Sequence, residues 1–205
     1  MILARKNFKK EKKMNKVVAR GLKCSLVIMG EEYIPLQVVY LNDPRINNFL
    51  LSRGPFNEEK QKERLRLKQE KGEQVLAIII PDSSNLNGWR FVGVVELRDF
   101  DHIEQSAFSA SFLGDVSCWG KGIAKEAKLL QLRVAFEELG LRSVFATTVG
   151  PNTRSQKLLE SVGYKLIGVR PKARNIGTEV HDEFLYCVSV GDWRSVWLSY
   201  LIQHE

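Results

Sequence analysis

The sequence predicts a single mixed domain of class α/β or α+β, built on one sheet that is partly antiparallel. Three observations lead to this fold class. The chain has 205 residues, of which 44% are hydrophobic and 27% charged, which is typical of a globular domain able to bury its own core. Two strand-like segments, 74–80 and 89–100, follow one another directly. Beyond them strands and helices alternate.

The individual elements follow from hydrophobic periodicity and from start and stop residues. Strands are expected within 21–30, 74–80, 89–100, 105–116, 142–149, 164–170 and 183–190. Helices are expected to begin at Asp43-Pro44 and to span 57–72, 125–140, 151–163 and 191–204. Gly72 and Gly140 are expected to end two of these helices, because glycine is common just after a helix. An apolar stripe at 123, 127, 130 and 134 begins just before the helix expected at 125–140 and runs along it.

The positive charge is concentrated at the N-terminus. The whole chain carries a formal net charge of +7, and residues 1–16 alone carry seven Lys or Arg and one Glu. We therefore expect a basic, flexible tail over residues 1–20 and one compact domain over 21–205. The tail is interpreted as a solvated leader, with a nucleic-acid or ribosome contact as the alternative.

Composition argues against several classes of protein. No apolar run reaches the roughly 18 to 20 residues of a membrane span, and the N-terminal residues lack the apolar region of a secretory signal. Three cysteines without a CxxC pair are typical of reduced thiols, so a cytoplasmic protein is expected. The three histidines have no metal-ligand spacing with the cysteines, so no metal site is expected.

The segment WGKGIA, residues 119–124, lies between an expected strand and an expected helix. A turn of this kind directs unpaired N–H groups and the positive end of the helix dipole at one point. Gly120 and Gly122 permit close approach of the backbone, and Lys121 adds a positive charge. The turn therefore predicts a phosphate site, although the two glycines alone are equally typical of a plain structural turn. Neither a dinucleotide fingerprint nor a P-loop fits the residues.

A second segment, NTRSQKLLESVGYKLIGVR, begins at residue 152, about thirty residues later. Together the two segments resemble the GNAT family of acetyl-coenzyme A dependent N-acetyltransferases, and most closely its branch of ribosomal-protein and polyamine acetyltransferases. Gly122 and Ala124 match fixed positions of the family's turn signature, whereas Trp119 stands where the family has Gln or Arg. The later segment matches the family pattern at Asn152, Ser155, Leu159, Gly163 and Tyr164. The resemblance covers roughly residues 22–190.

The resemblance implies a mostly antiparallel central sheet, flanked by helices and splayed around the cofactor. It implies acetyl-CoA as co-substrate. The pyrophosphate is then expected on the N–H groups of Trp119, Gly120, Lys121, Gly122, Ile123 and Ala124. The pantetheine arm is expected beside the strand end formed by Gly114, Asp115 and Val116. Asn152 is the candidate to bond this arm, and Lys157 is a candidate charged contact.

The family mechanism requires direct attack of a primary amine on the acetyl thioester. The enzyme must accept a proton from the amine and protonate or stabilise the leaving thiolate. Many relatives carry a tyrosine proton donor where this chain has Leu159, and some carry a glutamate base where it has Ser109. The branch resemblance makes Ser155 the candidate for the thiolate. Glu96 is the candidate base by its position on a strand. The alternatives are proton loss through ordered water or another nearby titratable residue, namely Asp99, Asp101, His102 or Glu104.

The expected acceptor is an amine, with a protein or peptide N-terminal amine favoured over a polyamine, an aminoglycoside or an amino sugar. Two alternatives to an active enzyme stay open at this point. One is a catalytically silent relative that still binds acetyl-CoA, and the other is a nucleic-acid-binding protein that relies on the basic tail. The same resemblance makes a homodimer a further expectation.

Overall fold

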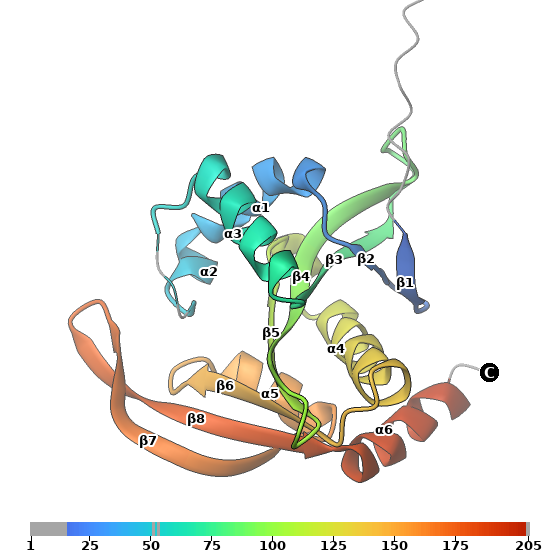
Figure 1. Cartoon of the computed structure of the whole chain (residues 1–205). Helices are drawn as coiled ribbons and strands as arrows, with labels where there is room; N and C mark the ends of the chain where they lie inside the picture. The colour runs from blue at the N-terminus through green and yellow to red at the C-terminus, as the bar shows by residue number, and fades with distance from the viewer. Residues whose placement is uncertain (1–15, 51, 53, 204–205) are drawn as a thin grey trace, which may run out of the picture.

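A single eight-stranded sheet runs through the protein, in a computed structural model that describes residues 16–50, 52 and 54–203. The strands are β1 (Val17–Arg20), β2 (Ser25–Ile28), β3 (Gln74–Pro81), β4 (Trp89–Asp101), β5 (Ser106–Leu113), β6 (Ser143–Val149), β7 (Lys165–Ile176) and β8 (Glu179–Ser189). Their order in the sheet is β1-β2-β3-β4-β5-β6-β8-β7 (Figure 1). Every neighbouring pair is antiparallel except β5 and β6, which are parallel. The predicted mixed, mostly antiparallel fold is confirmed.

The expected helices are present, with starts and ends that local residues explain. They are α2 (Pro44–Asn47), α3 (Glu58–Glu70), α4 (Ile123–Arg133, continued by a π-turn over Val134–Glu138), α5 (Thr153–Ser161) and α6 (Val190–Ile202), and a further helix, α1 (Ile34–Leu41), precedes them. At the start of α2 the Asp43 carboxylate accepts a hydrogen bond from the Arg45 N–H at 2.9 Å. Gly72 follows α3 with φ of 72°, the left-handed conformation that ends a helix.

Helices cover both faces of the N-terminal half of the sheet. On one face α1 and α3 pack over β2, β3 and β4, in a core that includes Ile34, Leu65 and Ala77. On the other face α4 packs in a core that includes Leu26 and Leu130. A third core joins α4 and α6 to the C-terminal strands. Because neighbours surround α4 on several sides, polar residues on this helix are buried along with its apolar stripe.

Two elements differ from the sequence-based expectation. Val17–Arg20 form β1, which pairs with β2 and buries Ala19, so the predicted tail is wrong at its C-terminal end. The rest of the predicted tail, residues 1–15, lies outside the described residues. Helix α1 was not predicted, because its sequence IPLQVVYL is apolar on every side and shows no clear period. Among the described residues, no helix is long and apolar enough to cross a membrane.

The parallel pair β5 and β6 comes apart halfway along its length. Pairing is limited to Ser106–Phe108 on β5 and Ser143–Phe145 on β6. Beyond these residues β5 continues to Leu113 beside β4, and β6 continues to Val149 beside β8. The two strands diverge in this region (Figure 1), which we call the splay. The splay predicted from the family resemblance is therefore present.

A buried carboxylate fixes the start of α4 to the loop between β1 and β2. Glu126 is 3% exposed and accepts hydrogen bonds from the N–H groups of Leu22, Lys23 and Cys24 at 3.1, 2.7 and 2.7 Å. The Tyr200 hydroxyl of α6 donates a fourth bond at 2.5 Å. Burial raises the pKa of Glu126, but the hydrogen bonds outweigh burial and the pKa lies below its usual value of 4.5. The N-terminus of α4 is thus held in one position.

Replacing Glu126 by Gln should lower the free energy of unfolding by about 2 kcal/mol at neutral pH, because an amide NH2 would face several N–H donors. The ionised carboxylate stabilises the fold above its unfolded pKa, and this contribution is lost as the pH falls through the lower folded pKa. Urea unfolding of both proteins at about pH 7 and about pH 3 measures this difference. Equal stability at neutral pH would contradict the anchoring role.

Candidate active site

The turn before α4 has the backbone conformation that a phosphate site needs. Gly120 and Gly122 have φ of 75° and 78°, in the left-handed region that favours glycine. The first bond of the helix runs from the Glu126 N–H to the Gly122 carbonyl at 3.1 Å. The N–H groups of Ile123, Ala124 and Lys125 therefore have no intrahelical partner. We call residues 120–125 the phosphate turn.

Trp119 has a structural role at the start of this turn. Its N–H donates to the Val116 carbonyl at 3.1 Å. This N–H is therefore not available for the pyrophosphate contact that the sequence predicts. Its indole Nε1 donates to the Leu113 carbonyl at 3.0 Å and ties the end of β5 to the turn. A side chain that differs from the family's Gln or Arg is therefore compatible with an intact turn.

Two basic side chains beside the phosphate turn were missed in the sequence. The Arg154 guanidinium of α5 lies 4.0 Å from the centre of the Trp119 ring. The Lys23 Nζ donates to the Lys121 carbonyl at 3.1 Å, and a Cβ on Gly122 would lie 2.9 Å from this Nζ. Glycine at 122 thus keeps room for a cation at the helix start. Positive charge and open N–H groups together fit a pyrophosphate.

The strand end at Gly114–Val116 is built differently from the prediction. The N–H groups of Gly114 and Asp115 both donate to the Val92 carbonyl of β4, at 2.8 and 3.2 Å, so they are not available to a pantetheine arm. A Cβ on Gly114 would lie 2.2 Å from the Tyr40 ring, so close packing alone requires this glycine. The free edge of β5 lies earlier, at Ser109–Leu113.

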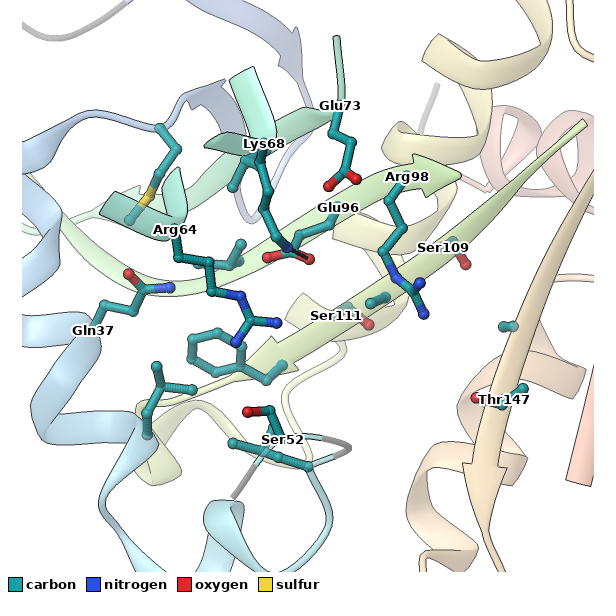
Figure 2. A pocket seen from close by; sticks show the side chains of 18 of the residues that line it. Gln37, Ser52, Arg64, Lys68, Glu73, Glu96, Arg98, Ser109, Ser111 and Thr147 are labelled. Atoms are coloured by element: carbon teal, nitrogen blue, oxygen red, sulfur yellow. Dashed lines mark hydrogen bonds and ion pairs between the residues drawn. The ribbon is translucent and has the colours of Figure 1, made fainter. Parts of the chain in front are cut away.

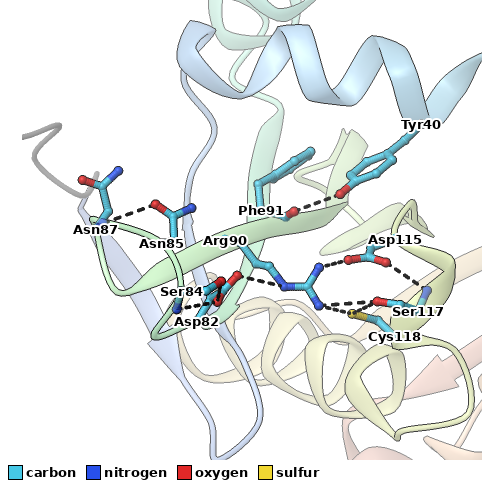
Figure 3. A network of polar contacts seen from close by, with 10 residues as sticks. All are labelled: Tyr40, Asp82, Ser84, Asn85, Asn87, Arg90, Phe91, Asp115, Ser117 and Cys118. Carbon is cyan, nitrogen blue, oxygen red and sulfur yellow. Dashed lines mark hydrogen bonds and ion pairs between the residues drawn. The ribbon is translucent and has the colours of Figure 1, made fainter.

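The Asp115 side chain belongs to a polar network that braces this loop (Figure 3). Its carboxylate forms an ion pair with Arg90 of β4 and accepts a hydrogen bond from the Ser117 N–H at 2.9 Å. The Arg90 Nε also lies 3.4 Å from the Asp82 carboxylate. The Asp115 side chain therefore positions the loop that precedes the phosphate turn. The sequence does not predict this role, because Arg90 is distant from Asp115 along the chain.

A cavity of about 610 Å³ occupies the splay. Its wall includes residues 109–112 of β5, residues 146–149 of β6, and Asn152, Ser155 and Leu159 at α5. Glu96 lies in the same wall, so the cavity brings together both predicted catalytic residues and Asn152. Lys157 does not line it and is exposed on α5, three residues from Arg154. The Thr148 hydroxyl is buried in the wall and has no hydrogen-bond partner among the described residues.

Asn152 and Ser155 form the start of α5. The Asn152 Oδ1 accepts a hydrogen bond from the Ser155 N–H at 3.1 Å and caps the helix. This bond uses the amide oxygen and leaves the Nδ2 donor for other partners. The Ser155 side chain is half-buried at the helix N-terminus, where the dipole favours a nearby negative charge such as a thiolate.

Glu96 is held by a neighbouring lysine. Its carboxylate forms an ion pair with Lys68 of α3, and both side chains are largely buried (Figure 2). The Glu96 main-chain carbonyl accepts a hydrogen bond from the Gln131 Nε2 of α4 at 2.7 Å. Glu96 therefore reaches the cavity already paired with a cation.

Comparison with known proteins agrees with this geometry. A family model described as an acetyltransferase (GNAT) domain matches residues 30–165. The chain belongs to the GNAT acetyltransferase family. It is an acetyl-CoA-dependent N-acetyltransferase, which transfers an acetyl group from acetyl-CoA to an amine.

Three relatives illustrate the relationship. An uncharacterized N-acetyltransferase, YnaD of Bacillus subtilis (strain 168), is 22% identical over 82% of this chain and 95% of its own length. The spermidine N-acetyltransferase of Vibrio cholerae, solved with CoA and spermine, superposes with a TM-score of 0.74 at 17% identity, over 84% of this chain and 98% of its own. The RimL ribosomal L7/L12 α-N-protein acetyltransferase, solved with coenzyme A, superposes with a TM-score of 0.72 at 16% identity, over 85% and 98%.

This GNAT enzyme also buries a lysine in the cavity wall, which the sequence pattern does not indicate. Lys128 of α4 is 1% exposed, and its Nζ donates to the Ser109 Oγ at 3.3 Å and the Gln131 Oε1 at 2.9 Å. Burial lowers the pKa of Lys128 to about 7, although the charge of Glu96 acts in the opposite direction. Lys128 falls outside the apolar stripe of its helix, so periodicity would place it in solvent.

Replacing Lys128 by Met should change the pH dependence of stability. The unfolded chain binds a proton at this lysine up to its usual pKa of 10.5, whereas the folded chain releases it near pH 7. Burial of Lys128 therefore destabilises the fold most at and below about pH 7, and this cost disappears as the pH rises toward 10.5. In urea unfolding, the free energy of unfolding of Lys128→Met relative to wild type should be highest near pH 7 and should fall toward pH 10. A pH-independent difference would show that Lys128 keeps its ordinary pKa.

Proposed function

We propose that the acceptor is the α-amine of a peptide or protein. The charge of the cavity wall carries this proposal. Besides the buried Lys128, the wall contains four basic side chains, Arg64, Lys68, Lys71 and Arg98, and three acidic ones, Glu73, Glu96 and Asp99. A polyamine brings several positive charges and would be repelled by this surplus, whereas a peptide brings one amine together with carbonyl and carboxylate groups.

The arrangement of the basic groups supports the same acceptor. Arg64 of α3 and Arg98 of β4 both extend toward the open part of the cavity (Figure 2). Arg98 is paired with Asp99 and lies over the Phe108 ring, whereas Arg64 has no ion-pair partner among the described residues. The Arg64 guanidinium can therefore bind a carbonyl or carboxylate of the acceptor.

In the proposed reaction the phosphate turn, Lys23 and Arg154 hold the pyrophosphate of acetyl-CoA, and the pantetheine arm extends along the free edge of β5. The amine lone pair attacks the thioester carbonyl carbon, the C–N bond forms and the C–S bond breaks. The Ser155 hydroxyl stabilises the departing thiolate by a hydrogen bond, and the thiolate takes up a proton. Asn152 supports the arm through its side-chain N–H groups.

The acceptor class is tested with three probes: the peptide Ala-Glu-Glu-Ala with a free α-amine, the same peptide N-formylated, and spermidine. We expect release of free CoA with the free peptide, with kcat/KM at least about tenfold above spermidine, and none with the formylated peptide. Arg64→Ala should lower kcat/KM for the peptide about fivefold through KM, because it removes one charged contact.

The matched control is Lys60→Ala, which removes an exposed positive charge from the same helix outside the cavity and should leave both constants unchanged. A clear preference for spermidine, or an Arg64→Ala enzyme with unchanged KM, would overturn the peptide assignment.

A further inference from the structure

Lys128 lines the cavity wall, is almost completely buried, and is not used by the reaction described so far. Within the described residues no carboxylate lies within ion-pair distance of its Nζ. Its contacts are the Ser109 hydroxyl and the Gln131 side-chain carbonyl, both uncharged. A permanently charged ammonium in this position would be desolvated without an opposite charge in contact, which is costly.

The contacts of Lys128 lead to the splay. Ser109 is the first residue of β5 beyond the last pair with β6, Phe108 with Phe145, and it lines the cavity. The Ser109 Oγ also lies 2.7 Å from the Tyr164 hydroxyl. One hydroxyl thus connects the Lys128 amine to the cavity, and Tyr164 fixes its orientation.

The charged and titratable groups around Lys128 come from three other elements. On β4, the charge of Glu96 acts on the lysine although Glu96 is paired with Lys68, and Arg98, which lines the same cavity, is paired with Asp99. Directly before β7, burial raises the pKa of Tyr164 well above its usual value, so its phenol stays protonated. On β5, Ser109 is neutral. Burial lowers the pKa of Lys128 to about 7 against the effect of the Glu96 charge, so a large fraction of this lysine is an uncharged amine at neutral pH.

We propose that the Lys128 amine is the general base of this enzyme and takes, through the Ser109 hydroxyl, the proton that the acceptor ammonium must lose. The proton moves from the acceptor nitrogen to the Ser109 oxygen while the Ser109 proton moves to the Lys128 Nζ. The acceptor becomes a neutral amine and Lys128 becomes an ammonium. The amine then attacks the thioester, its second proton goes to the thiolate, and Lys128 releases its proton to water.

This role rests on acetylation of an amine in the cavity and holds for a peptide or a polyamine acceptor. It also accounts for the absence of an acidic side chain at residue 109, since a lysine on the neighbouring helix can supply the basic group. An uncharged lysine with a pKa near neutral pH is well suited to general base catalysis.

The test is the pH profile of kcat/KM for Lys128→Met, measured with Ala-Glu-Glu-Ala and separately with spermidine. We expect about a 100-fold loss near pH 6.5. With the peptide the loss should shrink to about threefold near pH 9.5, because an α-amine with a pKa of about 8 is then already neutral. Lys128→Arg keeps hydrogen-bond donors but cannot give up its proton, so it should be as impaired as Lys128→Met.

Ser109→Ala interrupts the path and should show the same pH-dependent loss, whereas Lys60→Met should match the wild type at every pH. With the peptide, a uniform loss across the pH range, recovery of activity in Lys128→Arg, or a pH-dependent loss in Glu96→Gln but not in Lys128→Met would overturn the proposal.

A second measurement does not depend on the acceptor. NMR titration of the lysine side chains, with Lys128→Met for assignment, should show one lysine with a pKa near 7 that responds to Ser109→Ala. A Lys128 that titrates near 10.5 would overturn the proposal even if the peptide is a good substrate. Failure of the peptide alone, with spermidine showing the loss of about 100-fold near pH 6.5 in Lys128→Met, would overturn only the acceptor assignment.

Discussion

The end of pairing between β5 and β6 is the constraint on which the active site depends. Parallel strands normally satisfy each other's backbone groups, but here pairing stops after Phe108 and Phe145. The unpaired edge of β5 then offers donors and acceptors along a cavity of about 610 Å³. An extended arm that carries amides, such as pantetheine, can satisfy them. Both strands stay paired on their other sides, β5 with β4 and β6 with β8.

Helix α4 carries the phosphate turn and Lys128 within about one turn of each other. Residues 120–125 offer N–H groups to a pyrophosphate, and Lys128 follows three residues after Lys125, about 4.5 Å further along the axis. Glu126 lies between them and anchors the helix to the β1–β2 loop and to α6. The same helix can therefore orient the phosphate end of acetyl-CoA and present a basic group to the splay. Small shifts of α4 would alter both functions together.

The sequence was sufficient for the fold class and for the two segments that mark the site, because their residues act at fixed spacing along one turn or helix. Contacts between distant elements could not be read in this way. Lys128 falls off the apolar stripe at 123, 127, 130 and 134, so its burial appears only when α4 packs between the sheet and α6. The roles of Asp115 and Arg154 depend on partners from other elements. Strand β1 was not predicted, because it has only four residues and this is too short for a hydrophobic period to show.

The phosphate turn is the most direct place to test the account, by calorimetric titration of acetyl-CoA into wild type, Gly122→Val and Gly88→Val. Gly122 and Gly88 have φ of 78° and 72°, so the two substitutions impose similar backbone strain, and only Gly122 belongs to the turn. We expect micromolar binding by the wild type and by Gly88→Val, and a loss of about 100-fold or more in Gly122→Val with the fold intact by circular dichroism. Undiminished binding by Gly122→Val, or no binding by the folded wild type, would contradict the assignment of this turn to acetyl-CoA.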